Sequence, residues 1–199
     1  MIIGFSGASH SGKSTIMRAL IEKNKDFVLI EEPIRKMIKD INELRKNPSM
    51  NLEVQEKIFK DRLSKIFESK KHTVYLSDRT LVDCFFYFTN YINHTQLSDS
   101  LKKDYFNLLH KFIDTLNAYD KLYDLTCLFK SIKPTEEQEL IRDYNLEMIQ
   151  EHEEFSIINL TKSLSKKIML FDLNKTSKEE VVSLIEIYIM KSQYSGLIG

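Results

Sequence analysis

The stretch that decides the fold is IIGFSGASHSGKSTIMRALI, residues 2–21. Its first part, Ile2–Ser6, is a short apolar run of β type and predicts a strand. Its last part, Ile16–Ile21, carries apolar residues at helical spacing. A loop with glycines lies between them, and the order strand, glycine loop, helix is the one that surrounds a phosphate with backbone N–H groups.

The loop satisfies the pattern G-x-x-x-x-G-K-[ST] with Gly7, Gly12, Lys13 and Ser14. Its glycines let the backbone approach a phosphate, and the helix that begins near Lys13 adds its positive N-terminal end. We expect the Lys13 ammonium to bridge the β- and γ-phosphates of ATP and the Ser14 hydroxyl to bind Mg²⁺. The other loop residues expected at the nucleotide are Ser9, His10, Ser11 and Thr15. No catalytic role is assigned to His10, because it occupies a free position of the pattern.

The rest of the chain alternates between strand and helix patterns. Further strands are predicted at 27–30, 73–77, 122–129 and 167–171, and helices at 34–45, 52–69, 80–94, 99–118 and after Thr176. Such alternation predicts an α/β protein, a three-layer P-loop NTPase fold with a five-stranded parallel sheet and a helical lid. No repeat or linker divides the chain, so residues 1–199 are expected to form one domain, with the lid at about 130–154.

Composition and charge exclude several classes of function. Basic and acidic residues balance at 29 each, so the net charge gives no argument for duplex DNA or an anionic membrane. Two distant cysteines, Cys84 and Cys127, form neither a disulfide framework nor a zinc spacing. The longest apolar run, 81–88, is short and contains Asp83, and the first residues lack a secretory signal. We therefore expect a cytoplasmic protein.

The other classes that use such a loop are less consistent with the chain. A GTPase needs N-K-x-D, whereas Asn174-Lys175-Thr176-Ser177 lacks the aspartate. A motor ATPase is usually larger and carries a hydrophobic strand that ends in adjacent acids, which the sequence does not show. Small-molecule kinases remain.

Two segments supply the groups that such a kinase needs on its acceptor side. Glu32 and Arg35 follow the second predicted strand, and Asp78, Arg79 and Asp83 follow the third. Ligands gather at the carboxyl ends of parallel strands. A carboxylate such as Glu32 can take a proton from a hydroxyl or bind a sugar. Asp78 can hold Mg²⁺ through water, Arg79 can bind a phosphate with its planar guanidinium, and Asp83 is expected to face the same cleft.

Arginine usage points to the same places. The chain has 23 lysines and only six arginines, so lysine is its general solvated cation. We therefore expect an arginine where the planar guanidinium, with its paired hydrogen bonds, is needed. Three of them, Arg35, Arg79 and Arg142, fall beside expected phosphate positions. Arg142 lies in the predicted lid and is expected to close over the phosphates.

The motifs occur in the order found in P-loop deoxynucleoside and deoxynucleotide kinases, which the chain resembles. The segments that carry the resemblance are the glycine loop, Glu32-Pro33, Gln55, Asp78-Arg79-Thr80 and Phe171-Asp172-Leu173-Asn174. They span nearly the whole chain, and those outside the loop are short.

The resemblance implies roles for individual residues. Glu32 is implied as the general base for a sugar hydroxyl, and Gln55 as the reader of the acceptor base. Asp78 and Arg79 are implied as holding Mg²⁺ and phosphate. Asp172–Lys175, with Asn174, is similar to the adenine loop, and His152-Glu153 resembles the His-Glu of the helix after the lid.

The resemblance also leaves choices open. Asp78-Arg79-Thr80 and Arg35 are similar to the ribosylnicotinamide-kinase type and to thymidylate kinases as well. The lid departs from the deoxynucleoside kinases, because 130–143 holds one arginine, Arg142, where they have several.

The predicted reaction is transfer of the γ-phosphate of Mg-ATP to a deoxynucleoside monophosphate or a deoxynucleoside. Arg35 beside Glu32 slightly favours a monophosphate. The alternatives are a partner-coupled ATPase without a small acceptor, a ribosylnicotinamide-type kinase, and a kinase of a base in DNA. A small nucleoside or nucleotide is the expected partner, membrane and nucleic acid are not, and a homodimer is left open.

Overall fold

A computed structural model describes residues 1–32, 47–70, 72–92, 97–132 and 146–195. Its sheet has five strands, all parallel, in the order β2-β3-β1-β4-β5. The strands are β1 (Ile2–Gly7), β2 (Val28–Ile30), β3 (Tyr75–Asp78), β4 (Leu125–Phe129) and β5 (Ile168–Phe171). This confirms the predicted five-stranded parallel sheet and puts the strand before the glycine loop in its centre.

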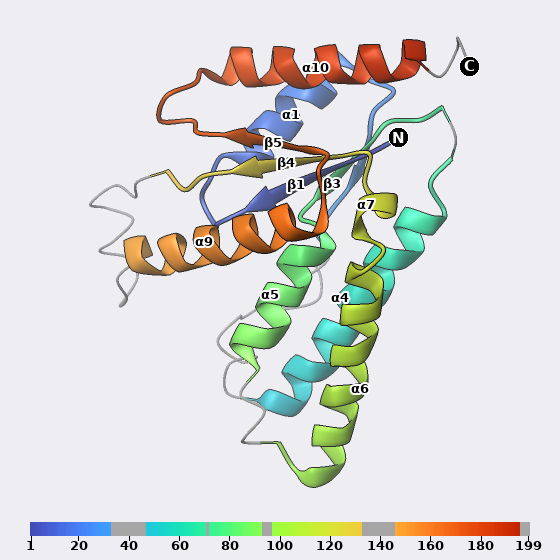
Figure 1. Ribbon diagram of the computed structural model, residues 1–199, viewed down its shortest axis with the longest axis vertical. Helices are drawn as coiled ribbons and strands as arrows, with labels where there is room; N and C mark the ends of the chain where they lie inside the picture. Colours follow the sequence, from blue (N-terminus) through green and yellow to red (C-terminus); the bar gives the residue numbers. More distant parts are fainter. Residues whose placement is uncertain (33–46, 71, 93–96, 133–145, 196–199) are drawn as a thin grey trace.

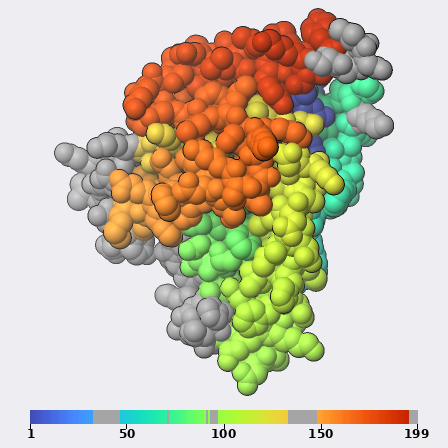
Figure 2. Space-filling model, in the orientation of Figure 1, coloured from blue at the N-terminus to red at the C-terminus, as the bar shows by residue number. Residues whose placement is uncertain are grey.

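Helices cover both faces of the sheet, so the predicted three layers are confirmed (Figure 1). One face carries α1 (Lys13–Lys23) and α10 (Lys178–Ser195), which pack against each other. The other carries α4 (Pro48–Phe67), α5 (Leu81–Tyr91), α6 (Asp99–Leu116) and α9 (Leu146–Leu164). In the space-filling view α6 forms the end of the molecule farthest from α10 (Figure 2).

Each face of the sheet contributes to its own apolar core. Ile3 and Phe5 of β1 point toward the α1 and α10 side and pack with Leu20 and Val181. Ile2 belongs to the core on the other side, which α4, α5 and α6 complete. Because both faces are covered, all residues of β1 and β4 are buried, as expected for central parallel strands. This central, rigid strand carries the glycine loop at its carboxyl end.

Two predicted boundaries need correction. The helix predicted from residue 52 begins at Pro48, because proline suits the first helical position and the Asn47 side chain accepts a hydrogen bond from Met50 N at 3.1 Å. The strand predicted at 122–129 begins only at Leu125. The residues before it form the short helix α7 (Tyr119–Leu122), whose buried Tyr119 hydroxyl lies 3.0 Å from Thr126 Oγ1.

Other predictions fall partly outside the described residues. The helix predicted at 34–45, with Arg35, lies outside them, as does 133–145 of the predicted lid, with Arg142. Of the described part of that lid, 130–132 follow β4, and 146–154 form the first half of the continuous helix α9, which contacts α5 and β1. None of the described helices has an apolar stretch long enough to cross a membrane.

Candidate active site

The glycine loop joins β1 to α1 in a conformation that requires both of its motif glycines. Gly7 has φ +130° and Gly12 has φ +82°, which are values that side chains disfavour. A Cβ at Gly7 would overlap the carbonyl oxygen of Phe129, and one at Gly12 would overlap the Leu173 side chain. The carbonyl of Gly12 accepts hydrogen bonds from the amides of Thr15 and Ile16 in the first turn of α1. The loop therefore turns tightly at the N-terminal end of this helix, as a phosphate site requires.

Lys13 lies inside the curve of this loop. Its side chain is buried, and its ammonium donates to Gly7 O at 3.0 Å, Ala8 O at 2.5 Å and Ser11 Oγ at 2.8 Å. Burial, and after it the nearby charge of Arg79, lowers the pKa of Lys13 to about 7, although the charge of Asp83 acts in the opposite direction. A phosphate in this loop would supply the negative charge that the ammonium lacks among its neutral partners.

The remaining loop residues differ in burial: Ala8 and Ser11 are buried, and Ser9 is partly buried. His10 is exposed, with φ 56°, and Ser14 and Thr15 are exposed on the first turn of α1. Asp78 ends β3 opposite Phe5 of β1, and its charge raises the pKa of Lys13. Ser14 and Asp78 thus offer oxygen ligands at the same end of the sheet, which is the ligand type that Mg²⁺ prefers. These residues fit the predicted magnesium ion.

Glu32 and Arg79 form an ion pair across neighbouring strands. Glu32 follows β2, Arg79 follows β3, and Arg79 Nε lies 3.0 Å from Glu32 Oε1, with both side chains mostly buried. Arg79 Nη1 also donates to Gly7 O at 3.2 Å, and its guanidinium lies 4.8 Å from the centre of the Tyr87 ring. The structure thus brings the predicted base and the predicted phosphate ligand together, beside the glycine loop.

Asp83, predicted as an acceptor contact, lies beside the site, with its Oδ1 3.4 Å from Arg79 Nη1. It lies in the first turn of α5 and is fully buried beneath the glycine loop. Its carboxylate accepts from Ser6 Oγ at 2.6 Å, Gly7 N at 3.2 Å and Thr80 N at 2.8 Å, and Thr80 completes a capping box with it. The prediction that Asp83 faces the cleft is therefore corrected: it holds β1, the loop and α5 together.

Gln55 lies on α4 and is buried, so it is not an ordinary polar residue on the solvent-facing side of the helix. Its amide donates to Asn51 Oδ1, one turn earlier, at 3.3 Å. The same helix also buries Arg62, whose exposed fraction is 0%. The predicted reading of a base by Gln55 stays a prediction.

Two residues of α9 hold the loop from the other side. Gln150 Nε2 donates to Ser9 O at 3.0 Å, and Glu153 Oε2 accepts from Ser9 N at 2.8 Å. Sequence reasoning missed Gln150 and identified Glu153 only through the His-Glu pair. His152 of that pair is exposed and lies near Asn90 instead, at 3.5 Å. The only sequence signal for Gln150 and Glu153 is their spacing of three, which places them on one helix face.

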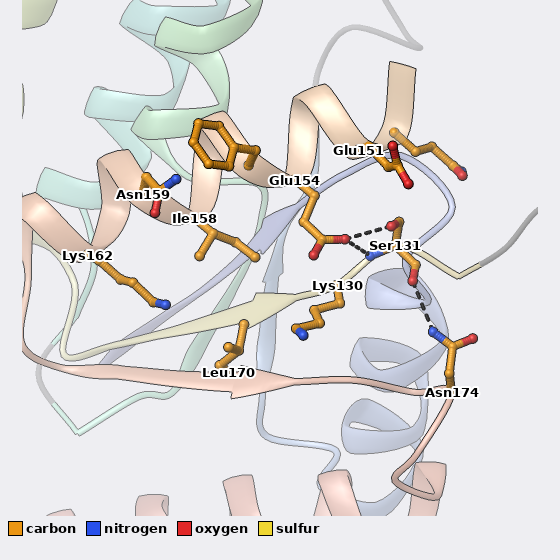
Figure 3. Close-up of a pocket in the computed structure, with 11 residues that line it drawn as sticks. Lys130, Ser131, Glu151, Glu154, Ile158, Asn159, Lys162, Leu170 and Asn174 are labelled. Carbon is orange, nitrogen blue, oxygen red and sulfur yellow. Dashed lines mark hydrogen bonds between the residues drawn. The ribbon is translucent and has the colours of Figure 1, made fainter. Parts of the chain in front are cut away.

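The loops after β4 and β5 close the other end of the site. Ile132 and Leu173 lie over Gly12, and Asn174 Nδ2 donates to Ser131 O at 3.1 Å. Beside this link lies a cavity of about 660 Å³ between α9 and the edge of the sheet. Figure 3 shows Glu154 reaching from α9 to Ser131, whose N and Oγ donate to it at 2.7 and 2.6 Å. Asn174, predicted at the adenine, thus joins the two loops next to the glycine loop.

Comparison with known proteins identifies a family and a shared fold. The model of a family described as an AAA domain matches residues 2–110. Deoxyadenosine kinase from M. mycoides with bound dATP is 17% identical, with a TM-score of 0.65 over 95% of this chain and 99% of that chain. The same kinase with bound dCTP is 18% identical, with a TM-score of 0.61 over 96% and 100%.

A structure of NadR protein in complex with NAD and AMP-PNP is 16% identical, with a TM-score of 0.62. The match covers 94% of this chain and 49% of that chain. No curated protein sequence gave a significant match. At these identities the structural likeness shows a shared fold, which is the predicted one.

Proposed function

The chain belongs to the AAA domain family, and from that premise we propose that it is an ATP-dependent kinase of a small nucleoside or nucleotide. The observation that carries the proposal is the ion pair of Glu32 and Arg79, which lies against the carbonyl of Gly7 in the glycine loop. In a kinase these two groups have complementary tasks. A kinase needs both, one for the acceptor hydroxyl and one for the transferred phosphate.

The donor side of the reaction is assigned to the glycine loop. Its amides and Lys13 would hold the β- and γ-phosphates of ATP, and Ser14 and Asp78 would hold Mg²⁺. When bound, the ion neutralises charge on the phosphate oxygens. Asn174 and Leu173 would border the adenine, since their loop lies over Gly12.

The acceptor side of the site is assigned to the carboxyl ends of β2 and β3, where Glu32 and Arg79 follow these strands. Glu32 is the base if the acceptor presents a hydroxyl, because its carboxylate lies at the end of β2 beside Arg79. Arg79 would bind the phosphate as charge develops. We propose a deoxynucleoside or its monophosphate as the acceptor. The named activity of the M. mycoides kinase supports the deoxynucleoside, and Arg35, with the lid residue Arg142, would supply the extra cations that a monophosphate needs.

A coupled assay of ADP release tests the proposal. Mg-ATP is offered with a panel of nucleosides and monophosphates, with Lys13→Ala as the blank. We expect acceptor-dependent turnover that the blank lacks. Glu32→Gln should lower kcat with the best hydroxyl acceptor by about 100-fold, as expected for a general base. Glu31→Gln, the exposed neighbour, serves as the matched control and should keep kcat.

The same assay separates the alternatives. Turnover that is the same with and without every acceptor would refute the kinase and favour a partner-coupled ATPase. A Glu32→Gln variant as active as the wild type would refute the assignment of the base. The best acceptor in the panel distinguishes nucleoside from monophosphate.

A further inference from the structure

Arg62 is a fully buried arginine whose hydrogen bonds converge on the active site. Its Nη1 donates to Ser77 Oγ at 2.8 Å and to Ile30 O at 3.3 Å, and its Nη2 donates to Asp78 O at 2.7 Å. Within the part of the chain that the structure describes, no carboxylate pairs with it and its Nε has no partner. A buried guanidinium is costly, so this arrangement requires an explanation.

The groups that accept hydrogen bonds from the Arg62 guanidinium lie at the ends of β2 and β3. Ile30 ends β2, and Ser77 and Asp78 end β3, so Arg62 joins two neighbouring strands at the end where Glu32 and Arg79 emerge. Ser77 then extends the connection, since its hydroxyl donates to Arg79 O at 2.9 Å. The carbonyls on both sides of the Arg79 Cα are therefore held, one by Arg62 and one by Ser77.

Arg79 itself has an unusual backbone. Its φ is 70°, in the left-handed region that residues with a side chain rarely adopt. Such a conformation persists only where the surroundings impose it. The turn is what brings the Arg79 side chain to Glu32 and to the glycine loop.

We propose that Arg62 and Ser77 form a brace that positions Arg79 for phosphate transfer. The proposal rests on the proposed kinase function and adds a positioning residue from α4, a helix that donates no group to the glycine loop in the described contacts. Arg62 acts through Arg79 and touches neither ATP nor acceptor. Its loss should lower kcat and leave the KM of the acceptor nearly unchanged.

A double-mutant cycle in kcat tests the brace. We expect Arg62→Met to lower kcat by about 100-fold, the effect of a small misplacement of a catalytic group. Ser77→Ala should lower it on the order of 10-fold, the loss of one hydrogen bond. In an Arg79→Ala background, neither substitution should lower kcat further, because the group they position is gone. Arg18→Met, at an exposed arginine of α1, is the matched control and should leave kcat unchanged.

Several results would overturn the brace. Losses that multiply in the Arg79→Ala background would show that Arg62 acts independently of Arg79. A raised KM with an unchanged kcat would make Arg62 an acceptor contact instead. If Arg62→Met does not fold, Ser77→Ala alone decides by the same criteria.

A second measurement does not depend on turnover. The Nε–H of Arg79, bound to Glu32, should give a slowly exchanging arginine signal in the ¹⁵N NMR spectrum, assigned by its loss in Arg79→Lys. We expect Ser77→Ala and Arg62→Met to speed its exchange, and Arg18→Met to leave it unchanged. Unchanged exchange in both brace variants would overturn the brace. If the wild type transfers no phosphate, the proposed function fails, and this spectrum alone judges the brace.

Discussion

Binding of Mg-ATP should change the protonation of Lys13, and the structure sets the size of the effect. Burial lowers the pKa of this lysine from 10.5 to about 7 in the folded protein. At pH 8 a group with that pKa is only about one-tenth protonated. Phosphates beside the ammonium would return its pKa above 9, because nearby negative charge favours the charged form. Binding at pH 8 should therefore take up about 0.8–0.9 proton, and binding at pH 6 about 0.1.

Titration calorimetry measures this uptake directly. The observed enthalpy is recorded at pH 8 in HEPES and in Tris, whose ionisation enthalpies differ, and the slope against that enthalpy is the number of protons. The terminal phosphate of ATP contributes little there, since its pKa is about 6. Lys13→Arg keeps the charge but does not titrate, so its uptake should be close to zero. Lys23→Arg, at the exposed end of the same helix, should keep the uptake of the wild type.

The lowered pKa of Lys13 should also affect how the free energy of unfolding of the nucleotide-free protein depends on pH. Because the pKa of Lys13 is lower in the folded chain, the unfolded chain binds more protons between pH 7 and 10.5. The contribution of Lys13 to the free energy of unfolding therefore rises with pH in this window, by up to about 1.4 kcal/mol per pH unit. Lys13→Met should show a shallower rise in denaturant titrations. A wild-type binding enthalpy at pH 8 that is the same in both buffers would refute the reasoning, because Lys13 would then already be charged.

Three further perturbations follow from the packing around the site. Asp83→Ala leaves the donors to this carboxylate unpaired and should lower the free energy of unfolding by about 3–5 kcal/mol, or the melting temperature by roughly 10 °C. Asp83→Asn should be less harmful. An unchanged melting temperature in Asp83→Ala would contradict the bracing role of this carboxylate. Gly7→Ala should cost about 3 kcal/mol by denaturant unfolding, because its Cβ would overlap the Phe129 carbonyl at φ +130°, and a stable variant would show that the loop adapts. Burial raises the pKa of Cys84 to about 12 and raises that of Cys127 further still. Neither thiol should therefore react with a disulfide reagent at pH 8 until the protein unfolds. Rapid labelling of the native protein would contradict their burial.

The glycine loop and the sheet could be predicted because the determining residues are contiguous. The run from Ile2 to Ile21 contains strand, loop and helix together, so local preferences and one motif were sufficient. Strand boundaries depended less on local pattern. The start of β4 was misplaced, because Tyr119 is buried through a helical turn and bonds to Thr126, a contact that alternation of residue types does not reveal.

The sequence identified individual residues of the site but not the contacts between them. Glu32 and Arg79 were identified from their places after two strands, but their ion pair requires β2 to lie beside β3. Gln150 and Glu153 reach the loop because α9 packs against β1. Although they lie 141 and 144 positions from Ser9 in the chain, one binds the carbonyl and the other the amide of that residue.

By itself, the sequence determined the phosphate-binding loop, the parallel α/β fold and the residue types around the site. Those properties follow from local backbone preferences and from the burial pattern along the chain. Only the tertiary structure decided that Asp83 lies beneath the loop and that Arg62 reaches the turn at Arg79. A polar side chain on an amphipathic helix looks the same in sequence whether it faces water or the interior. Its role is set by the groups that the fold brings within hydrogen-bonding distance, and the chain order alone does not specify them.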